Sequence, residues 1–315
     1  MSRSEGFVLA LSGGIGGAKL ALGLYRILPP GALMVVANTG DDFEHLGLAI
    51  SPDIDTLLYT LAGLDNPELG WGRRDETWTF MKALGDLGGE TWFNLGDGDL
   101  AIHVERTRRL AAGESLSEIT DDFRRRLGIS ARLLPMSDER VRTRLRTQEG
   151  WLDFQDYFVR LRCAPVVREI AFAGADQARP QPDFLAALAD LNLQAVVICP
   201  SNPFISINPI LSLPGIREAL RACHAPVVAV SPIIGGKAVK GPTAKMMAEL
   251  GLPVDAATVA RHYGDILRHY VADEADANEI GDLGVPVTVT RTLMLSLEDR
   301  ARLARVVLEA ASRGF

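Results

Sequence analysis

The sequence contains little of what disulfide-stapled, zinc-binding or membrane proteins need. Its 315 residues include only 3 cysteines, Cys163, Cys199 and Cys223, which lie far apart and form no Cys-x-x-Cys pair. This usage fits reduced thiols better than a disulfide framework or a zinc site. No apolar run approaches the length of a membrane span, and no secretory signal pattern is present. We therefore expect a cytoplasmic protein with no membrane partner.

Positive charge and histidine are also scarce. Lys and Arg number 33 against 40 for Asp and Glu, which gives a formal net charge of −7 and argues against a nucleic-acid partner. The 5 histidines show no metal-ligand spacing. We expect His103, His224, His262 and His269 to be core or surface residues, and only His45, near acidic residues, to be a functional candidate.

Short apolar strands alternate with amphipathic helices at both ends of the chain. The expected strands are residues 7–11, 33–37, 92–95, 166–172, 195–199, 227–230 and 285–290. This alternation predicts an α/β fold, a Rossmann-like three-layer αβα arrangement with a mostly parallel sheet. Ser296 and Asp299 predict a capping box at the start of a last helix.

The alternation is interrupted between residues 106 and 162. Ser117 is expected to cap a helix there, and the run VRTRLRT alternates as a half-exposed strand does. We therefore expect a Rossmann-like core of residues 6–105 and 163–315. Residues 106–162 would form an inserted, more irregular subdomain of helices and strands, or a lid.

A glycine-rich turn follows the first expected strand and opens a helix. The N–H groups at a helix N-terminus bind anions, usually phosphate. The turn does not match Walker A, because Lys19 is followed by Leu20, and it lacks the third glycine of the dinucleotide fingerprint. We predict that a phosphorylated ligand contacts Ser12, Gly13, Gly14, Gly16 and Lys19. The alternative is a close-packed strand–helix turn with no ligand.

The loop after the second expected strand is dense in carboxylates. Asp41, Asp42, Glu44, Asp53 and Asp55 occur within fifteen positions, beside the phosphate turn. Carboxylate oxygens suit Mg²⁺, which bridges to substrate phosphates. We expect Asp41 and Asp53 as metal ligands and Asn38 at the nucleotide. One of Asp53 and Asp55 is also expected to cap the following helix.

Three later loops continue the pattern, and ligands bind open α/β sheets outside the carboxyl ends of the strands. In LGDGDLA, Asp97 and Asp99 either orient a ligand hydroxyl or hold the turn. The loop CPSNPFISINPIL offers neutral hydrogen-bonding groups that suit a nucleotide base or sugar, and SPIIGGKAVKGP offers a second phosphate contact. The expected binding residues are Ser201, Asn202, Pro203, Ser206, Gly235, Gly236 and Lys237.

Taken together, these motifs resemble the 2-phospho-L-lactate transferase family. They are SGGIGGAKL, NTGDD, ISPDIDTLLYTLAG, GWGRRDETW, LGDGDLA, LLPMSDERVRT, FQDYFV, PSNPFISINPILSLPGIR and AVSPIIGGKAVKGP, in that order from Val8 to Met294. The resemblance implies an Mg²⁺-dependent transferase of coenzyme F420 biosynthesis. It would move a phospholactyl, or related phosphoenolpyruvyl or phosphoglyceryl, group from a guanosine diphosphate-linked donor to the ribityl hydroxyl of the deazaflavin Fo. The products would be F420-0, or its dehydro form, and GMP.

The resemblance also implies individual residues. Family contacts to Fo fall on Asp55 and on Asn94, a position where other members often carry a charged residue, and we add Asp97. Asp55 and Asp41 are the expected catalytic carboxylates, since phosphoryl-group transfer needs charge neutralisation and a proton acceptor. Ile15 replaces the threonine common in the family, which loses one hydroxyl but leaves the backbone donors.

We expect a homodimer. Two other functions remain open: a sugar-nucleotide-binding regulator of related fold that does not turn over, and a dinucleotide-dependent oxidoreductase. The failed glycine fingerprint disfavours the second.

Overall fold

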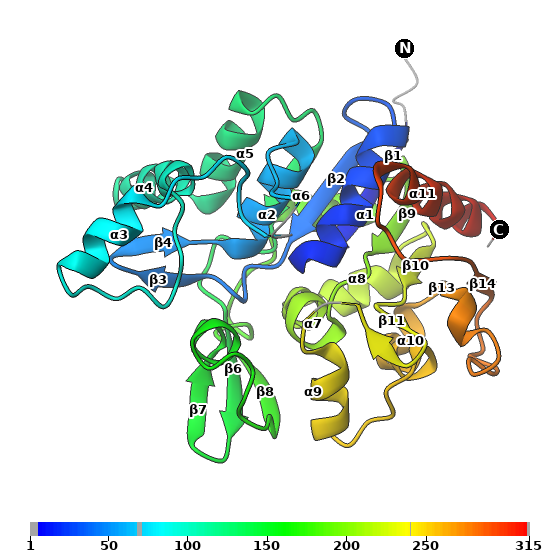
Figure 1. Cartoon of the computed structure of the whole chain (residues 1–315). Coiled ribbons are helices and arrows are strands. Elements are labelled where there is room, and N and C mark those ends of the chain that lie inside the picture. The colour runs from blue at the N-terminus through cyan, green and yellow to red at the C-terminus, as the bar shows by residue number, and fades with distance from the viewer. Residues whose placement is uncertain (1–5, 68–70, 240, 314–315) are drawn as a thin grey trace, which may run out of the picture.

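The computed structural model describes residues 6–67, 71–239 and 241–313, and its centre is a seven-stranded sheet (Figure 1). The strand order is β14-β13-β10-β9-β1-β2-β5, and every neighbouring pair is parallel. The predicted α/β fold with a mostly parallel sheet is therefore confirmed. The strands are β1 (Phe7–Ser12), β2 (Leu33–Ala37), β5 (Arg132–Pro135), β9 (Leu193–Ile198), β10 (Val227–Val230), β13 (His269–Ala272) and β14 (Val287–Val289).

Helices cover both faces of this sheet because its central strands are apolar on both sides. Along β1, Val8 and Ala10 pack into one hydrophobic core, and Leu9 and Leu11 pack into the other. The first core contains α1 (Gly14–Ile27), α2 (Pro52–Ala62), α5 (Leu116–Arg126) and α11 (Leu297–Ser312). The second contains α6 (Pro182–Ala189), α7 (Asn208–Leu211), α8 (Ile216–Ala222), α9 (Thr243–Glu249) and α10 (Ala256–Tyr263).

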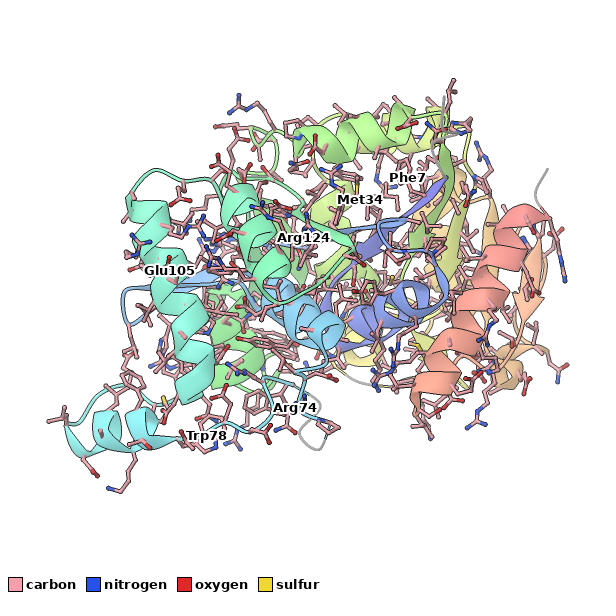
Figure 2. The ribbon with its side chains drawn as sticks, turned by 90° about the horizontal axis from the view of Figure 1, so that it is seen from above. Phe7, Met34, Arg74, Trp78, Glu105 and Arg124 are labelled. Atoms are coloured by element: carbon pink, nitrogen blue, oxygen red, sulfur yellow. The ribbon has the colours of Figure 1, made fainter. Side chains whose placement is uncertain are left out.

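Smaller elements extend from the carboxyl end of the sheet. β3 (Phe43–His45) and β4 (Leu48–Ile50) form a hairpin that packs against α4 (Asp97–Ala111), with α3 (Thr79–Asp86) nearby. β6 (Arg142–Thr147), β7 (Gly150–Asp153) and β8 (Glu169–Ala173) form an antiparallel sheet, and β11 (Ile233–Ile234) pairs with β12 (Lys237–Ala238). In the described residues there are also four short helical turns, η1 (Asp156–Arg160), η2 (Pro203–Ile207), η3 (Gly264–Ile266) and η4 (Glu274–Asp276). In the view from above, α4 with Glu105 and α5 with Arg124 lie side by side (Figure 2).

The segment 106–162 does not form a single separate unit. β5 is the edge strand of the central sheet, because its buried Leu133 and Leu134 pack beside β2 on opposite faces. β6 and β7 instead join β8, which lies outside the segment, and α4 runs through residue 106 without a break. The expected boundaries therefore differ from the structure. That the segment moves as a lid stays a prediction.

The predicted helix caps and one predicted strand can be compared with the structure. The capping box of Ser296 and Asp299 is confirmed. The cap of α5 is Ser115 rather than Ser117, because Ser115 has a glutamate three residues later, and Ser117 bonds Asp138 instead. Residues 92–95 form no strand. Within the described ranges, no helix has the length and apolar character needed to cross a bilayer.

Candidate active site

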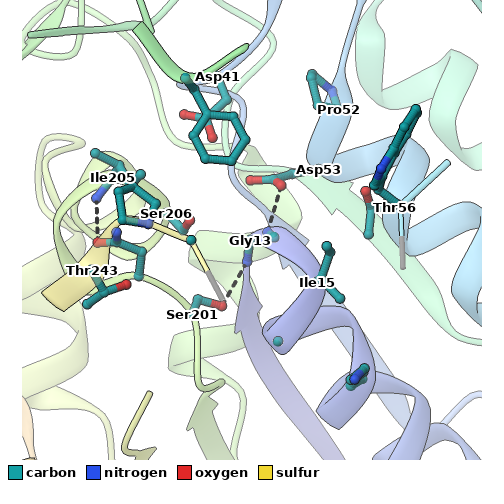
Figure 3. Close-up of a pocket in the computed structure, with 18 of the residues that line it drawn as sticks. Gly13, Ile15, Asp41, Pro52, Asp53, Thr56, Ser201, Ile205, Ser206 and Thr243 are labelled. Atoms are coloured by element: carbon teal, nitrogen blue, oxygen red, sulfur yellow. Dashed lines mark hydrogen bonds between the residues drawn. The ribbon is translucent and has the colours of Figure 1, made fainter. Parts of the chain in front are cut away.

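The site lies where the strand order reverses, between β1 and β9. β1 leads into Gly13 and α1, and β9 leads into Ser201. The Gly13 N–H donates to Ser201 Oγ at 3.1 Å, which joins the two loops (Figure 3). A cavity of about 580 Å³ opens at this point, and residues from α1, α2, α4, η1 and the loops after β9, β10 and β14 line it. The position is the usual ligand site of open α/β sheets.

Close packing requires the glycines of the first turn. A Cβ at Gly16 would lie 2.4 Å from the carbonyl oxygen of Pro200, and one at Gly17 would lie 2.4 Å from Ser12 Oγ. Gly14 adopts a φ of +64°, which favours glycine. The glycines therefore do allow close packing, and this packing holds α1 against the loop after β9. The packing does not decide whether the turn also binds a ligand.

Gly13, Gly14 and Gly16, all predicted to contact the ligand, line the cavity, but the N–H groups of the first two already have partners. Gly13 N–H is bonded to Ser201, and Gly14 N–H donates to Asp53 Oδ1 at 2.6 Å. The next two residues, Ile15 and Gly16, line the cavity in the first turn of α1, where N–H groups have no partner within the helix. Ile15, which was not predicted, and Gly16, which was, are therefore the residues of this turn whose backbone N–H groups remain available at the cavity.

Asp41, in the loop after β2, and Asp53, in the first turn of α2, face the same cavity (Figure 3). Burial raises the pKa of Asp53 to about 6, although hydrogen bonds from Asn38 and Gly14 lower it. Burial, and then the charge of Asp53, raise the pKa of Asp41 well above its usual value. Asp41 Oδ1 is buried without a hydrogen-bond partner. Two carboxylates that repel each other in this way suit a cation.

An Mg²⁺ ion at this place would have two carboxylate ligands from the protein, Asp41 and Asp53. Among the residues described, no group of three or more His, Cys, Asp or Glu side chains could hold a metal. Mg²⁺ is commonly held by one or two carboxylates together with substrate phosphates and water. The pair Asp41 and Asp53 beside the N-terminus of α1 therefore fits the ion in the presence of a phosphate ligand.

The predicted helix cap is wrong for both aspartates. The N-cap residue of α2 is Ser51, and Asp53 and Asp55 lie inside the first turn. Asp53 instead accepts from Gly14 and from Asn38 Nδ2. Asn38 was expected at the nucleotide, but it is buried and absent from the cavity lining. It donates to Asp53 and so positions that carboxylate. Ser12 is likewise buried away from the cavity.

A buried charged network continues from α2 to α4. Asp55 pairs through both carboxylate oxygens with Arg106, and His103 lies between Asp55 and Asp99. Tyr59 donates its hydroxyl hydrogen to Asp99. All of these residues except Arg106 line the cavity, and His103 is 2% exposed.

His103 and Arg106 were not predicted as site residues from the sequence, and His45 was the only histidine expected to be a functional candidate. His45 packs against the rings of Trp92 and Phe93, outside the cavity lining. The available signal was helical spacing, because Asp99, His103 and Arg106 recur at intervals of four and three and so share one face of α4.

Several expected ligand residues lie elsewhere. Asp97 is half-buried, is absent from the cavity lining and accepts from Thr77 Oγ1 and from Phe80 N, so it binds the start of α3 rather than a ligand or its own turn. Pro203, Gly235, Gly236 and Lys237 are absent from the cavity lining.

Gly235 and Gly236 connect β11 and β12 in a tight turn with φ values of +55° and +68°. Two successive positive φ values are typical of a type I′ hairpin turn, which explains both glycines without a phosphate. The Gly236 N–H donates to Asp276.

The loop after β9 does reach the cavity. Ser201, Asn202 and Ser206 line it. Asn202 Oδ1 also accepts from the N–H groups of Phe204 and Ile205, so it caps η2. Lys19 lines the cavity too, and its ammonium donates to the Met294 carbonyl.

Part of the cavity lining is aromatic. Trp71, Phe93, Phe154 and Phe158 line it, and the two residues that the resemblance assigns to Fo, Asp55 and Asn94, also lie in the lining. The lining thus combines the polar groups of the glycine turn, here called the polar end, with four aromatic side chains, here called the aromatic end.

The chain is similar to known proteins both in sequence and in fold. The family model of the 2-phospho-L-lactate transferase CofD matches residues 8–293. The chain is 42% identical over 316 residues to the phosphoenolpyruvate transferase of Kitasatospora aureofaciens, which covers 97% of this chain and 98% of the relative. It is 38% identical over 329 residues to that of Mycobacterium tuberculosis, covering 96% and 98%. A crystal structure of a UPF0052 family member from Bacillus halodurans superposes with a TM-score of 0.66 at 14% identity, over 98% of this chain and 100% of that one, which shows the fold.

Proposed function

Because the chain belongs to the 2-phospho-L-lactate transferase CofD family and is therefore a transferase, we propose that it joins a three-carbon phospho-acid to the ribityl hydroxyl of Fo in coenzyme F420 biosynthesis. The donor would be the guanosine diphosphate-linked acid, and GMP would leave. One observation carries the proposal: a single cavity joins the N-terminus of α1 and two buried carboxylates to an aromatic end.

The polar end suits the diphosphate of the donor. Ile15 and Gly16 offer N–H groups there, Lys19 adds a positive charge, and Ser201 and Ser206 add hydroxyls. Asn202 lies in the same loop, next to the space that a base or sugar would take. The aromatic end suits a flat ring system such as a deazaflavin, since aromatic side chains stack on such rings.

Asp41 and Asp53 would hold Mg²⁺. When bound, this ion would neutralise charge on the diphosphate. The protein itself has three tasks in this reaction: its backbone donors orient the donor, its apolar wall excludes water, and a carboxylate accepts the hydroxyl proton.

The chemical step exchanges one bond at phosphorus for another. The Fo hydroxyl oxygen bonds to the phosphorus of the three-carbon group, and the bond from that phosphorus to the oxygen of GMP breaks. Asp55 and Asp41 are the catalytic carboxylates expected from the sequence, and the proton acceptor was Asp55 or a neighbour of it. The ion pair of Asp55 with buried Arg106 makes Asp55 better suited to fixing the wall of the cavity.

For the donor, we propose the phosphoenolpyruvyl compound first, since the relatives from Kitasatospora and Mycobacterium are named phosphoenolpyruvate transferases. Phospholactyl and phosphoglyceryl donors differ from it at one or two atoms, and pockets separate such differences by only about 1–3 kcal/mol unless they hydrogen-bond them. We therefore expect some use of more than one donor.

The test is turnover by the purified protein. Fo, Mg²⁺ and each of the three donors are incubated separately with the enzyme, and the phosphodiester product and GMP are detected by mass. We expect both products to form in equal amounts. Binding of the donor with no product from any of the three would contradict the proposal and favour a nucleotide-binding regulator.

We further propose the cytoplasm as the working compartment, since all three cysteines are free. A homodimer also remains a proposal, to be tested by the mass of the protein in solution.

A further inference from the structure

Asp99 presents a carboxylate to the aromatic end of the cavity, and two neighbours hold it in place. Tyr59 donates to its Oδ1, and His103 Nε2 lies 3.1 Å from its Oδ2. The Asp99 side chain is 17% exposed, against 7% for Asp55, whose two oxygens face Arg106. Asp99 is therefore the carboxylate that a bound hydroxyl can reach in this part of the wall.

Arg106 fixes which nitrogen of His103 carries the proton. Arg106 Nη1 lies 3.4 Å from His103 Nδ1, and a guanidinium can only donate. Nδ1 is therefore the acceptor, and a ring proton sits on Nε2, on the side of Asp99. Nε2 is buried and lies in direct contact with Asp99 Oδ2, at 3.1 Å. His103 therefore holds the Asp99 carboxylate in place against α4.

We propose that Asp99 is the catalytic residue that accepts the proton of the acceptor hydroxyl, with His103 and Tyr59 as positioning residues. The inference rests on the proposed transfer to Fo. In the step, the hydroxyl O–H bond breaks and its proton passes to Asp99. The oxygen forms the new bond to phosphorus, and GMP leaves with the electron pair of the bond that breaks.

A weak base is adequate for this chemistry. In protein kinases an aspartate accepts the proton of the hydroxyl that attacks phosphorus, so a carboxylate is a sufficient base for such an attack. Burial raises the pKa of Asp99, but contacts with His103 and Tyr59 outweigh burial and leave the pKa below its usual value. The ionisable groups around it are Tyr59 and Asp55 from α2 and His103 and Arg106 from α4.

The first experiment replaces Asp99 and compares turnover. Asp99→Asn keeps an oxygen that can accept from Tyr59 but cannot take a proton. We expect kcat to fall by at least about a hundredfold, with the KM for Fo and the Mg²⁺ requirement changed by less than about threefold. The matched control is Glu105→Gln, which removes one carboxylate from the exposed side of α4 and should leave kcat unchanged.

The second experiment uses the pH profile of Tyr59→Phe. This variant removes a donor that lowers the pKa of Asp99, so the acidic limb of the kcat profile should move to higher pH. Loss of packing alone would lower kcat without moving the limb. The profile also keeps the proposal testable if Asp99→Asn does not fold.

The possible outcomes distinguish a failure of the proposed function from a failure of the role proposed for Asp99. An inactive wild-type protein would refute the proposed function, and this inference with it. An active wild type with Asp99→Asn within about tenfold of it would refute the inference alone. A large rise in the KM for Fo with kcat unchanged would show that Asp99 only binds the acceptor, and would also overturn it.

Discussion

At the scale of single residues, the pair Asp55 and Arg106 has the largest effect on stability that we can argue. Arg106 is 1% exposed, and Asp55 is its main partner, with the Ala49 carbonyl at 3.3 Å as a minor one. Removing one member of a buried ion pair leaves the other charge uncompensated, at a cost of about 3–5 kcal/mol. We expect Asp55→Asn to lose that much free energy of unfolding, measured by urea denaturation.

The control for this prediction is the exposed pair of Glu105 and Arg108, on the same helix as Arg106. Glu105→Gln should change the free energy of unfolding by less than about 1 kcal/mol, because surface ion pairs contribute little. If Asp55→Asn lost no more than this control, Arg106 would have to be satisfied by other groups. Any loss of activity in Asp55→Asn must therefore be measured below its unfolding transition.

At the scale of elements, the contact of α1 with the loop after β9 depends on Gly16. An alanine Cβ there would lie 2.4 Å from the Pro200 carbonyl oxygen, which is backbone and cannot rotate away. We expect Gly16→Ala to displace the N-terminus of α1 and to weaken binding of a guanosine diphosphate by at least about tenfold, measured by calorimetry.

Gly85→Ala is the matched control for this substitution. Gly85 lies in α3, and its added Cβ would meet only Thr91 Cγ2, at an ordinary 3.6 Å. Alanine is the better helix former, so this variant should bind normally and unfold no earlier. Equal affinity in both variants would show that the first turn of α1 does not form the phosphate subsite.

The contact between α10 and α7 gives a pH prediction. His262 Nε2 lies 2.9 Å from Asn208 Oδ1, and burial, followed by the charge of Arg217, lowers the pKa of His262. The unfolded chain therefore takes up this proton at a higher pH than the folded one. The stability contribution is present above about pH 6.5 and is lost as the pH falls through the folded pKa.

His262→Gln removes this titration but keeps an amide that can bond Asn208. We expect the urea midpoint of the wild type to drop more than that of His262→Gln between about pH 7.5 and about pH 5. His45 and His269 also have lowered pKa values through burial, but they titrate in both proteins and cancel in the comparison. Parallel midpoints would contradict the prediction.

The elements also show which predictions sequence allows. β1 and β2 were predicted because an apolar strand buried on both faces is visible in sequence alone. The edge strand β5 was not, because its pairing with β2 depends on a contact about a hundred residues away. His103 was missed for a related reason: a histidine on a helix gains its function from Asp55 and Arg106, and only the fold shows that Asp55 lies beside it.

At the scale of the whole molecule, the cavity wall joins parts of the chain that lie far apart in the sequence. Its wall combines α1 and α2, α4, the antiparallel sheet region near Phe154, and the loops after β9, β10 and β14. Both hydrophobic cores contribute elements to this wall. A ligand that fills the cavity should therefore stabilise the entire fold rather than one loop.

Stabilisation of the whole fold should require the nucleotide and Mg²⁺ together. Asp41 and Asp53 already repel each other, so the diphosphate of GDP would bring further negative charge to the same place. Neutralisation by a divalent cation removes that repulsion. At a hundredfold excess over its Kd, a ligand adds about 2.7 kcal/mol to the free energy of unfolding. We expect GDP with Mg²⁺ to raise the thermal unfolding midpoint clearly, and GDP with EDTA to raise it little. Asp41→Asn removes one of the repelling charges, so in this variant the difference between Mg²⁺ and EDTA should shrink. Equal shifts with and without the cation in the wild type would mean that these carboxylates do not hold it.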